Sequence, residues 1–277
     1  MGNKSCKRSN VSPSIITLRK EVHLGALKEV SEGLKQKGVQ FVNLIVGVCY
    51  TRREGWAARE TNLHRIIEGN PNNYERVIFL VGKTIKALNE DNTIHCFGFG
   101  DATTNTSRIF RFYREEVPSP GFEEAATRYN LIAKYARLTE KVSYDVIIRK
   151  AISVASQSRD QHHVLVIIAS EPVSRSLDTQ PGNPSVDDHE QNSINAIVMA
   201  RNYRLSIVLV GVGEANEHMM RRLRNRITGA DNFKFVDYTQ IMSTNEPLER
   251  KENEFCLAVF EHLLTEITES ERLHILR

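Results

Sequence analysis

Residues 43–56, NLIVGVCYTRREGW, contain the pattern that decides the fold. Residues 43–48 are almost wholly apolar, which is typical of a central parallel strand that is buried on both faces. Polar and charged residues follow from Thr51 onward and predict a loop at the carboxyl end of this strand. Because ligands of open α/β sheets bind outside the carboxyl ends of the strands, this loop is the first place to search for a site.

The rest of the chain alternates between strand and helix patterns. Apolar runs predict five strands, at residues 41–48, 93–99, 164–169, 206–212 and 233–236. Helical spacing falls between them, at residues 74–88, 122–138, 144–156, 191–201 and 217–227, and a final amphipathic helix begins near Leu248. Such alternation gives right-handed crossovers between parallel strands. We therefore expect an α/β fold, with a doubly wound, mostly parallel sheet and helices on both faces.

Length and composition fit one large domain. The 277 residues are long for one small domain and short for two, and 40% hydrophobic with 26% charged residues suits a globular protein with a core. Residues 1–17 are polar and basic, and Ser12-Pro13 should break any helix, so we expect a flexible arm there. The domain then covers residues 18–277 and opens with a helix from about Leu18.

Charge and cysteine content exclude several classes of function. A net charge of +3 is too small to indicate nucleic-acid binding, and no segment approaches the ~20 apolar residues of a membrane span. The four cysteines lie far apart without a Cys-x-x-Cys pair, so a zinc or disulfide framework is not expected. Reduced thiols and the lack of an apolar leader predict a protein inside the cell, in the cytoplasm, at the plasma membrane or in the nucleus.

Two glycine motifs and one cysteine are candidates for nucleotide binding and for nucleophilic catalysis. The stretches GFGDAT (98–103) and GVGEAN (211–216) supply only Gly-x-Gly, which is too little for a dinucleotide site, and no P-loop occurs. Cys49 follows the first strand as a nucleophile might, but a nucleophile needs a positioned base. The pair His162-His163 should lie at the opposite edge of the sheet, and nothing in the sequence places His64 nearby. We therefore expect an unreactive thiol.

The N-terminal residues resemble an acylation signal. Gly2 follows Met1 as N-myristoylation requires, although Cys6 stands where Ser or Thr is usual. Cys6 is a candidate for palmitoylation, and two acyl chains would make membrane binding stable. The alternative is an unmodified, disordered start, and both interpretations stay open.

Several sequence strings together resemble a known family. They are CFGFGDATT (96–104), GFEEAATRY (121–129), HHVLVIIAS (162–170), LSIVLVGVG (205–213) and DNFKFVDYTQIM (231–242). The chain from about Val22 to Ile267 is similar to the copine-type von Willebrand factor A domain, in the form found in plant copine-like ubiquitin ligases that carry a C-terminal RING. The resemblance implies a doubly wound parallel sheet and an acylated N-terminus.

The resemblance also implies a metal site, which this sequence does not preserve. The family holds its metal with Asp-x-Ser/Thr-x-Ser after the first strand, a Thr in a second loop and an Asp after a later strand. Matched to these positions, Cys49 replaces the first Asp, Thr51 keeps its hydroxyl and Arg53 replaces the Ser. Val142 stands at the Thr position and Ser170 at the second Asp position. We therefore expect a degenerate site.

Loss of these ligands leads to the expectation that no cofactor is bound. Mg²⁺ and Ca²⁺ require several oxygen ligands at one point. Thr51 and Asp101 would be the residual oxygen ligands, and the positive charge of Arg53 would oppose a cation. We expect Mg²⁺ and Ca²⁺ binding to be lost.

The leading interpretation is a non-enzymatic module that binds a protein partner through the carboxyl edge of the sheet. Arg52, Arg53 and Trp56 are the expected contact residues, because Trp and Arg are frequent interface anchors; the alternative is that they pack locally or are solvated. Ubiquitin-ligase relatives or their substrates are the expected partners. The alternative function is a ubiquitin ligase family member or subunit. A RING needs several Cys and His ligands, and only Cys256 lies near residue 277, so we expect no ubiquitin transfer by this chain alone.

Overall fold

The structure is a computed structural model of the whole chain. It describes residues 12–21, 32–33, 35–36, 42–52, 62–88, 91–113, 117–158, 161–171, 188–213, 225–227 and 231–275. The predictions made for Gly2, Cys6, Arg53 and Trp56, and most of the helix expected at 217–227, lie outside these residues.

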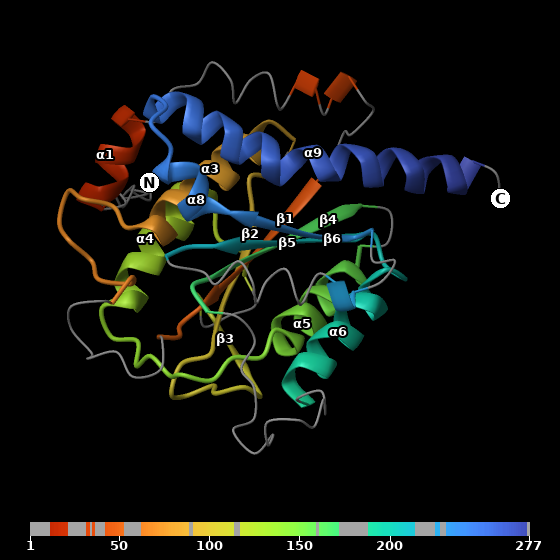
Figure 1. The fold of residues 1–277 in the computed structure, drawn as a ribbon, viewed down its shortest axis with the longest axis horizontal. Coiled ribbons are helices and arrows are strands. Elements are labelled where there is room, and N and C mark those ends of the chain that lie inside the picture. The colour runs from red at the N-terminus through yellow and green to blue at the C-terminus, as the bar shows by residue number, and fades with distance from the viewer. Residues whose placement is uncertain are drawn as a thin grey trace, which may run out of the picture.

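A six-stranded sheet forms the centre of the molecule, in the order β3-β2-β1-β4-β5-β6 (Figure 1). Neighbouring strands are parallel, except that β3 runs antiparallel to β2. The strands are β1 Val42–Cys49, β2 Ile94–Phe99, β3 Ile109–Arg111, β4 His162–Ala169, β5 Leu205–Gly211 and β6 Phe233–Asp237. The predicted doubly wound, mostly parallel sheet is confirmed, and the five predicted strands agree with the observed bounds to within two residues.

Helices cover both faces of this sheet. The described helices are α1 Pro13–Glu21, α3 Asn73–Ile85, α4 Phe122–Ala133, α5 Asp145–Ala155, α6 Asp188–Ala200, α8 Tyr238–Ser243 and α9 Leu248–Ile275, and a 3₁₀ turn, η1 Lys86–Leu88, follows α3. Helices α1, α3, α4 and α9 contribute to one hydrophobic cluster, whereas α5 and α6 contribute to the other (Figure 1). Each face of the sheet therefore has its own layer of helices.

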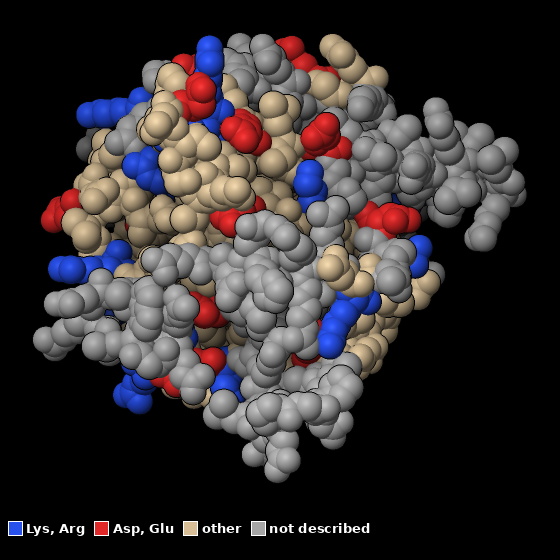
Figure 2. Space-filling model, viewed as in Figure 1, with Lys and Arg blue, Asp and Glu red and all other residues tan. Residues whose placement is uncertain are grey.

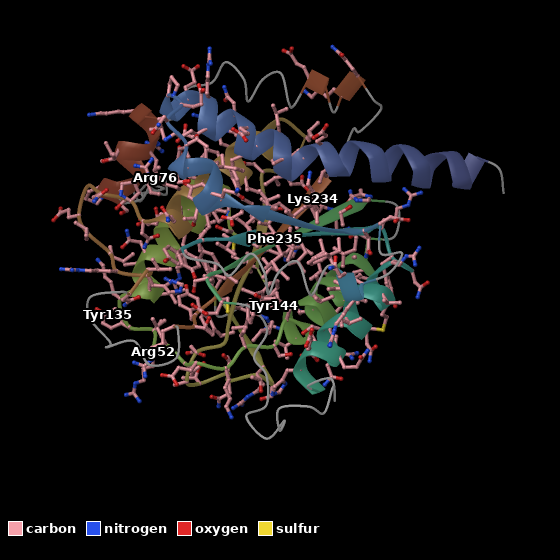
Figure 3. All side chains as sticks on the ribbon, viewed as in Figure 1. Arg52, Arg76, Tyr135, Tyr144, Lys234 and Phe235 are labelled. Carbon is pink, nitrogen blue, oxygen red and sulfur yellow. The ribbon has the colours of Figure 1, made fainter. Side chains whose placement is uncertain are left out.

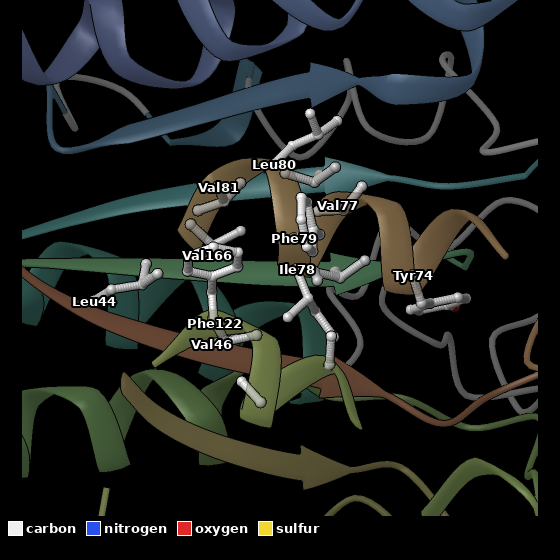
Figure 4. Packing of buried hydrophobic residues seen from close by; sticks show 14 of the residues in the cluster. Leu44, Val46, Tyr74, Val77, Ile78, Phe79, Leu80, Val81, Phe122 and Val166 are labelled. Atoms are coloured by element: carbon white, nitrogen blue, oxygen red, sulfur yellow. The ribbon is translucent and has the colours of Figure 1, made fainter. Parts of the chain in front are cut away.

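Strand β1 shows why a nearly continuous apolar run is needed at the centre. Leu44, Val46 and Val48 join the cluster beneath α3, whereas Ile45 and Cys49 join the cluster beneath α5. Figure 4 shows Leu44 and Val46 packed close to α3. Because successive side chains point to opposite faces, every residue of this strand must suit a buried environment, and each large apolar side chain contributes about 1.5–3 kcal/mol.

The first helix corrects the predicted boundary of the N-terminal arm. Helix α1 begins at Pro13, earlier than the expected start near Leu18, and Ile15 and Leu18 are both fully buried. Proline suits the first turn of a helix because the amide hydrogen that it lacks would have no partner within the helix there. Pro13 therefore starts a helix that we expected it to prevent.

Three other elements differ from the prediction. Strand β3 is only three residues long and α8 only six, so neither was expected. Helix α8 is capped by the Asp237 side chain, which accepts a hydrogen bond from the Gln240 amide at 2.9 Å. Helix α4 ends at Ala133 and not at Leu138, because the backbone at 137–139 bonds instead to the loops that follow β1 and β2.

Gly82 generates a testable prediction about the contact between α3 and α4. A Cβ atom added at Gly82 would lie 2.2 Å from the Cβ atom of Phe122. A Gly→Ala change at a solvent-exposed helix position stabilises the folded protein by about 1 kcal/mol, whereas an added methyl group in a packed core destabilises it by about 1–3 kcal/mol. We expect Gly82→Ala to lower the free energy of unfolding in urea. The control is Gly33→Ala, where the added Cβ meets no atom within 4 Å and should not destabilise; equal effects of both changes would contradict the prediction.

Candidate functional site at the carboxyl edge of the sheet

Three chain segments meet where β1 and β2 end. The Tyr50 amide donates to the Phe99 carbonyl at 2.8 Å, and the Arg52 amide donates to the Thr139 carbonyl at 2.7 Å. The Ala102 amide donates to the Arg137 carbonyl at 2.8 Å. Residues 137–139 therefore lie between the loops after β1 and β2 and tie them together, in an arrangement that we call the loop seam.

Cys49 lies fully buried at the base of the seam. Its Sγ atom is 3.3 Å from the Thr51 Oγ1 atom, and Thr51 itself is only 2% exposed. Burial raises the pKa of the Cys49 thiol to about 12, so the side chain is neutral at physiological pH. At this position the structure places a small uncharged group.

Val142 and Ser170 are also buried beside this edge. Val142 is fully buried in the cluster beneath α5, which also contains Cys49, and its side chain has no ligand atom. Ser170 follows β4 and is 4% exposed. Burial raises the pKa of the neighbouring Tyr74 phenol, and the Ser170 hydroxyl partly opposes this shift. Neither position supplies a carboxylate.

Asp101 uses its carboxylate to hold its own turn. Its Oδ1 atom accepts hydrogen bonds from the Thr104 amide at 2.9 Å and the Thr104 hydroxyl at 2.5 Å. The Thr103 hydroxyl lies 2.9 Å from both carboxylate oxygens. The preceding Gly100 has φ +77°, a conformation that favours glycine. These bonds make GFGDAT a strand-exit turn. Within the described part of the chain, no group of three or more His, Cys, Asp or Glu residues is arranged to hold a metal ion.

His64 contacts the loop seam from the protein interior, and the sequence did not predict this contact. Its ring stacks between Tyr50 and Tyr74, with centroid distances of 4.8 and 3.9 Å. Its Nε2 atom lies 3.1 Å from the Cys49 carbonyl oxygen, and its Nδ1 atom lies 2.9 Å from the Tyr129 hydroxyl. Because a carbonyl only accepts, Nε2 carries the proton and Nδ1 accepts from Tyr129.

This geometry does not activate Cys49. His64 bonds to the backbone of Cys49, and burial lowers the pKa of His64 to about 3. The thiol hydrogen-bond partner is Thr51, which is no base. The pair His162-His163 begins β4 and so lies at the opposite edge of the sheet, as expected. The nearby carboxylate of Glu171 raises the pKa of the thiol further, which also opposes its ionisation.

Arg52 is anchored at the surface of the seam. Its guanidinium pairs with Glu140 at 3.1 Å, and both side chains are 37% exposed. Exposed pairs of this kind contribute only about 0–1 kcal/mol, so Arg52 stays available to a partner. Figure 3 shows Arg52 and Tyr135 at the same end of the molecule. Tyr135 was not predicted, because exposure after a helix leaves no periodic signal in the sequence.

Comparison with known proteins identifies the family. The family model described as Copine matches residues 62–276. The chain belongs to the Copine family. It is 43% identical over 239 residues to E3 ubiquitin-protein ligase RGLG1 of Arabidopsis thaliana, covering 84% of this chain and 48% of that protein. It is 38% identical over 262 residues to E3 ubiquitin-protein ligase RGLG3 of the same plant, covering 92% of this chain and 69% of that protein.

Further relatives and solved structures are similar to this chain. Copine family protein 2 of Caenorhabditis elegans is 31% identical over 229 residues, covering 79% of this chain and 3% of that protein. Solved structures that match include a von Willebrand factor type A protein from Catenulispora acidiphila, at 9% identity and a TM-score of 0.45. The match covers 79% of this chain and 43% of that chain. The chain spans about half the length of RGLG1 and RGLG2.

The Copine assignment confirms the resemblance read from the sequence. The family is as predicted, and the six-stranded sheet has the doubly wound, mostly parallel order that was expected. Among the described residues, no helix is both long enough and apolar enough to cross a membrane.

His64 generates a prediction about pH. Its pKa is about 3 in the folded chain and about 6.5 when unfolded, so the unfolded state binds a proton first as pH falls. The free energy of unfolding therefore keeps the full His64 contribution above pH 6.5. Below that pH the contribution is lost, by about 2 kcal/mol between pH 7 and pH 5. His162, with a pKa also lowered to about 3 by burial, adds to the same trend.

Urea unfolding of the wild type and of His64→Gln at pH 7, 6 and 5 measures this effect. The variant should be less stable at pH 7 but lose about 2 kcal/mol less on acidification. The same loss in both proteins would show that the pKa of His64 does not differ between the folded and unfolded states.

Proposed function

We propose that this chain is a non-enzymatic protein-interaction module that recognises its partner through the loop seam without a metal ion. The pair Cys49 and Val142 is the observation that carries the proposal. Both side chains are fully buried, and neither carries the oxygen ligand that the family pattern requires there. A hard cation needs several oxygen ligands at one point, and these two positions provide none.

The remaining residues support the same proposal. The carboxylate of Asp101 is engaged by Thr103 and Thr104, so it would have to leave these bonds to bind a cation. Ser170 has a hydroxyl where the family has a carboxylate, and Arg53 would add positive charge. The seam itself is held by backbone hydrogen bonds, which position its surface.

A second candidate function is a part in ubiquitin transfer. The observation that favours it is the 43% identity to a protein named as an E3 ubiquitin-protein ligase, of which this chain spans 48%. The partners would be such ligases or their substrates, bound at the same edge. Acylation of Gly2 and Cys6, with attachment to membranes, stays a prediction, and mass spectrometry of the N-terminal peptide decides it.

Calorimetric titration with Mg²⁺, Mn²⁺ and Ca²⁺ tests the metal-free proposal. The wild type should give no binding heat. A variant with Cys49→Asp, Arg53→Ser, Val142→Thr and Ser170→Asp should gain affinity, because it regains carboxylate and hydroxyl ligands. Micromolar binding by the wild type would overturn the proposal. Since the wild type decides alone, the test remains valid even if the variant does not fold.

A reconstituted ubiquitination reaction separates the two candidate functions. With ubiquitin-activating and ubiquitin-conjugating enzymes, this chain alone should form no ubiquitin chains, and adding it to full-length RGLG1 should change the rate of chain formation if the two proteins act together. Chain formation without RGLG1 would show ligase activity and overturn the non-enzymatic proposal. An unchanged rate would remove the second candidate and leave the interaction module.

A further inference from the structure

A basic and aromatic surface lies beside the loop seam at the end of α4. Tyr135 is 85% exposed, and Leu131, four residues earlier, is 48% exposed. Lys134 and Arg137 flank Tyr135 and are also exposed. We call these four residues together with Arg52 the α4 patch. Among the described residues, the side chains of Lys134, Tyr135 and Arg137 have no hydrogen-bond or ion-pair partner.

The patch is attached firmly to the sheet. The Arg137 carbonyl accepts from the Ala102 amide at 2.8 Å, and Leu138 forms a β-bridge with Asp101. The Tyr135 amide donates to the Ile132 carbonyl at 3.0 Å, which continues the last turn of α4. A partner would therefore meet a surface whose backbone is already ordered, and ordering costs on binding would be small.

The charge of this surface is positive. Lys134, Arg137 and Arg52 give the α4 patch a charge of +3, and the opposite charges of the neighbouring Lys141 and Glu140 cancel. On the face seen in Figure 2, the described Lys and Arg side chains are interspersed with Asp and Glu. An exposed Tyr between cationic side chains is the kind of anchor that protein interfaces use, because Tyr and Arg dominate their binding energy.

We propose that the α4 patch binds an acidic segment of a partner protein. Carboxylates of the segment pair with Arg137 and Lys134, and an apolar side chain packs on Tyr135 and Leu131. A protein fits better than a nucleic acid, because the patch has one aromatic residue and an aliphatic one and does not interleave several aromatics for base stacking. This inference rests on the proposed function and names the chemistry of the partner that the seam would receive.

Nuclear magnetic resonance of the full ¹⁵N-labelled chain in EDTA tests the proposal. The probes are a synthetic peptide of Glu residues with two Leu residues and matched peptides with Lys or Gln in place of Glu. The Glu peptide should shift the amides of residues 131–141 and of Arg52, and the Lys and Gln peptides should not. Binding should weaken when salt is raised well above the physiological level, because exposed charges are screened.

Three variants connect this binding to named side chains. Arg137→Glu should weaken the affinity for the Glu peptide by about tenfold, and Tyr135→Ala should weaken it several-fold. The matched control is Arg201→Glu, since Arg201 is exposed, has the same charge change and precedes β5 at the opposite edge of the sheet. The control should bind like the wild type.

The outcomes separate this inference from the function on which it rests. No binding by the Glu peptide, or equal weakening by Arg137→Glu and Arg201→Glu, would overturn the patch and leave the metal-free module intact. Peptide binding that appears only with Mg²⁺ and moves the amides of residues 49–51 would overturn the metal-free function. Tighter binding of polyuridylic acid to the same amides would replace the acidic protein segment with a nucleic acid and would also overturn the inference.

Discussion

The burial of β1 on both of its faces is the constraint on which the rest of the structure depends. The strand lies between β2 and β4, so its backbone groups bond on either side, and its side chains alternate between two separate hydrophobic clusters. From Leu44 to Cys49 every residue of the strand is buried, and a polar side chain there would lose its hydration. Strand β1 ends at Cys49, which is still fully buried, so the first residue at the carboxyl edge must also suit the core.

At that edge the buried positions of Cys49 and Val142 hold neutral, packed side chains. A carboxylate at the position of Cys49 would be buried, and an ion would be needed to offset its desolvation. The neutral thiol needs no such partner, and Val142 extends the apolar cluster up to the same point. His64 completes the arrangement from the other face, where it donates to the Cys49 carbonyl and stacks on two tyrosines. The exit from the central strand is therefore stabilised by rings and backbone bonds.

Periodicity and composition predicted most of the sheet, because buried parallel strands leave long apolar runs. This pattern marked β1, β4 and β5, whose residues are almost all buried. It failed for β3, whose three residues are too few to show alternation, and for the end of α4, which is set by hydrogen bonds to distant loops. The expectation of degenerate ligand positions came from a family pattern. The contact of His64 with Cys49, in contrast, depends on a fold that brings together residues 15 positions apart.

The loop seam also bears on how quickly a partner can dock. Loops that close over a ligand must first be ordered, and that rearrangement often limits the rate of association. Here residues 137–139 already connect the exits of β1 and β2, so little remains to be rearranged on contact. Encounter at this edge would then be governed by diffusion and by long-range attraction between opposite charges. A surface of this kind favours partners that come and go rapidly, with selectivity expressed in how long each one stays.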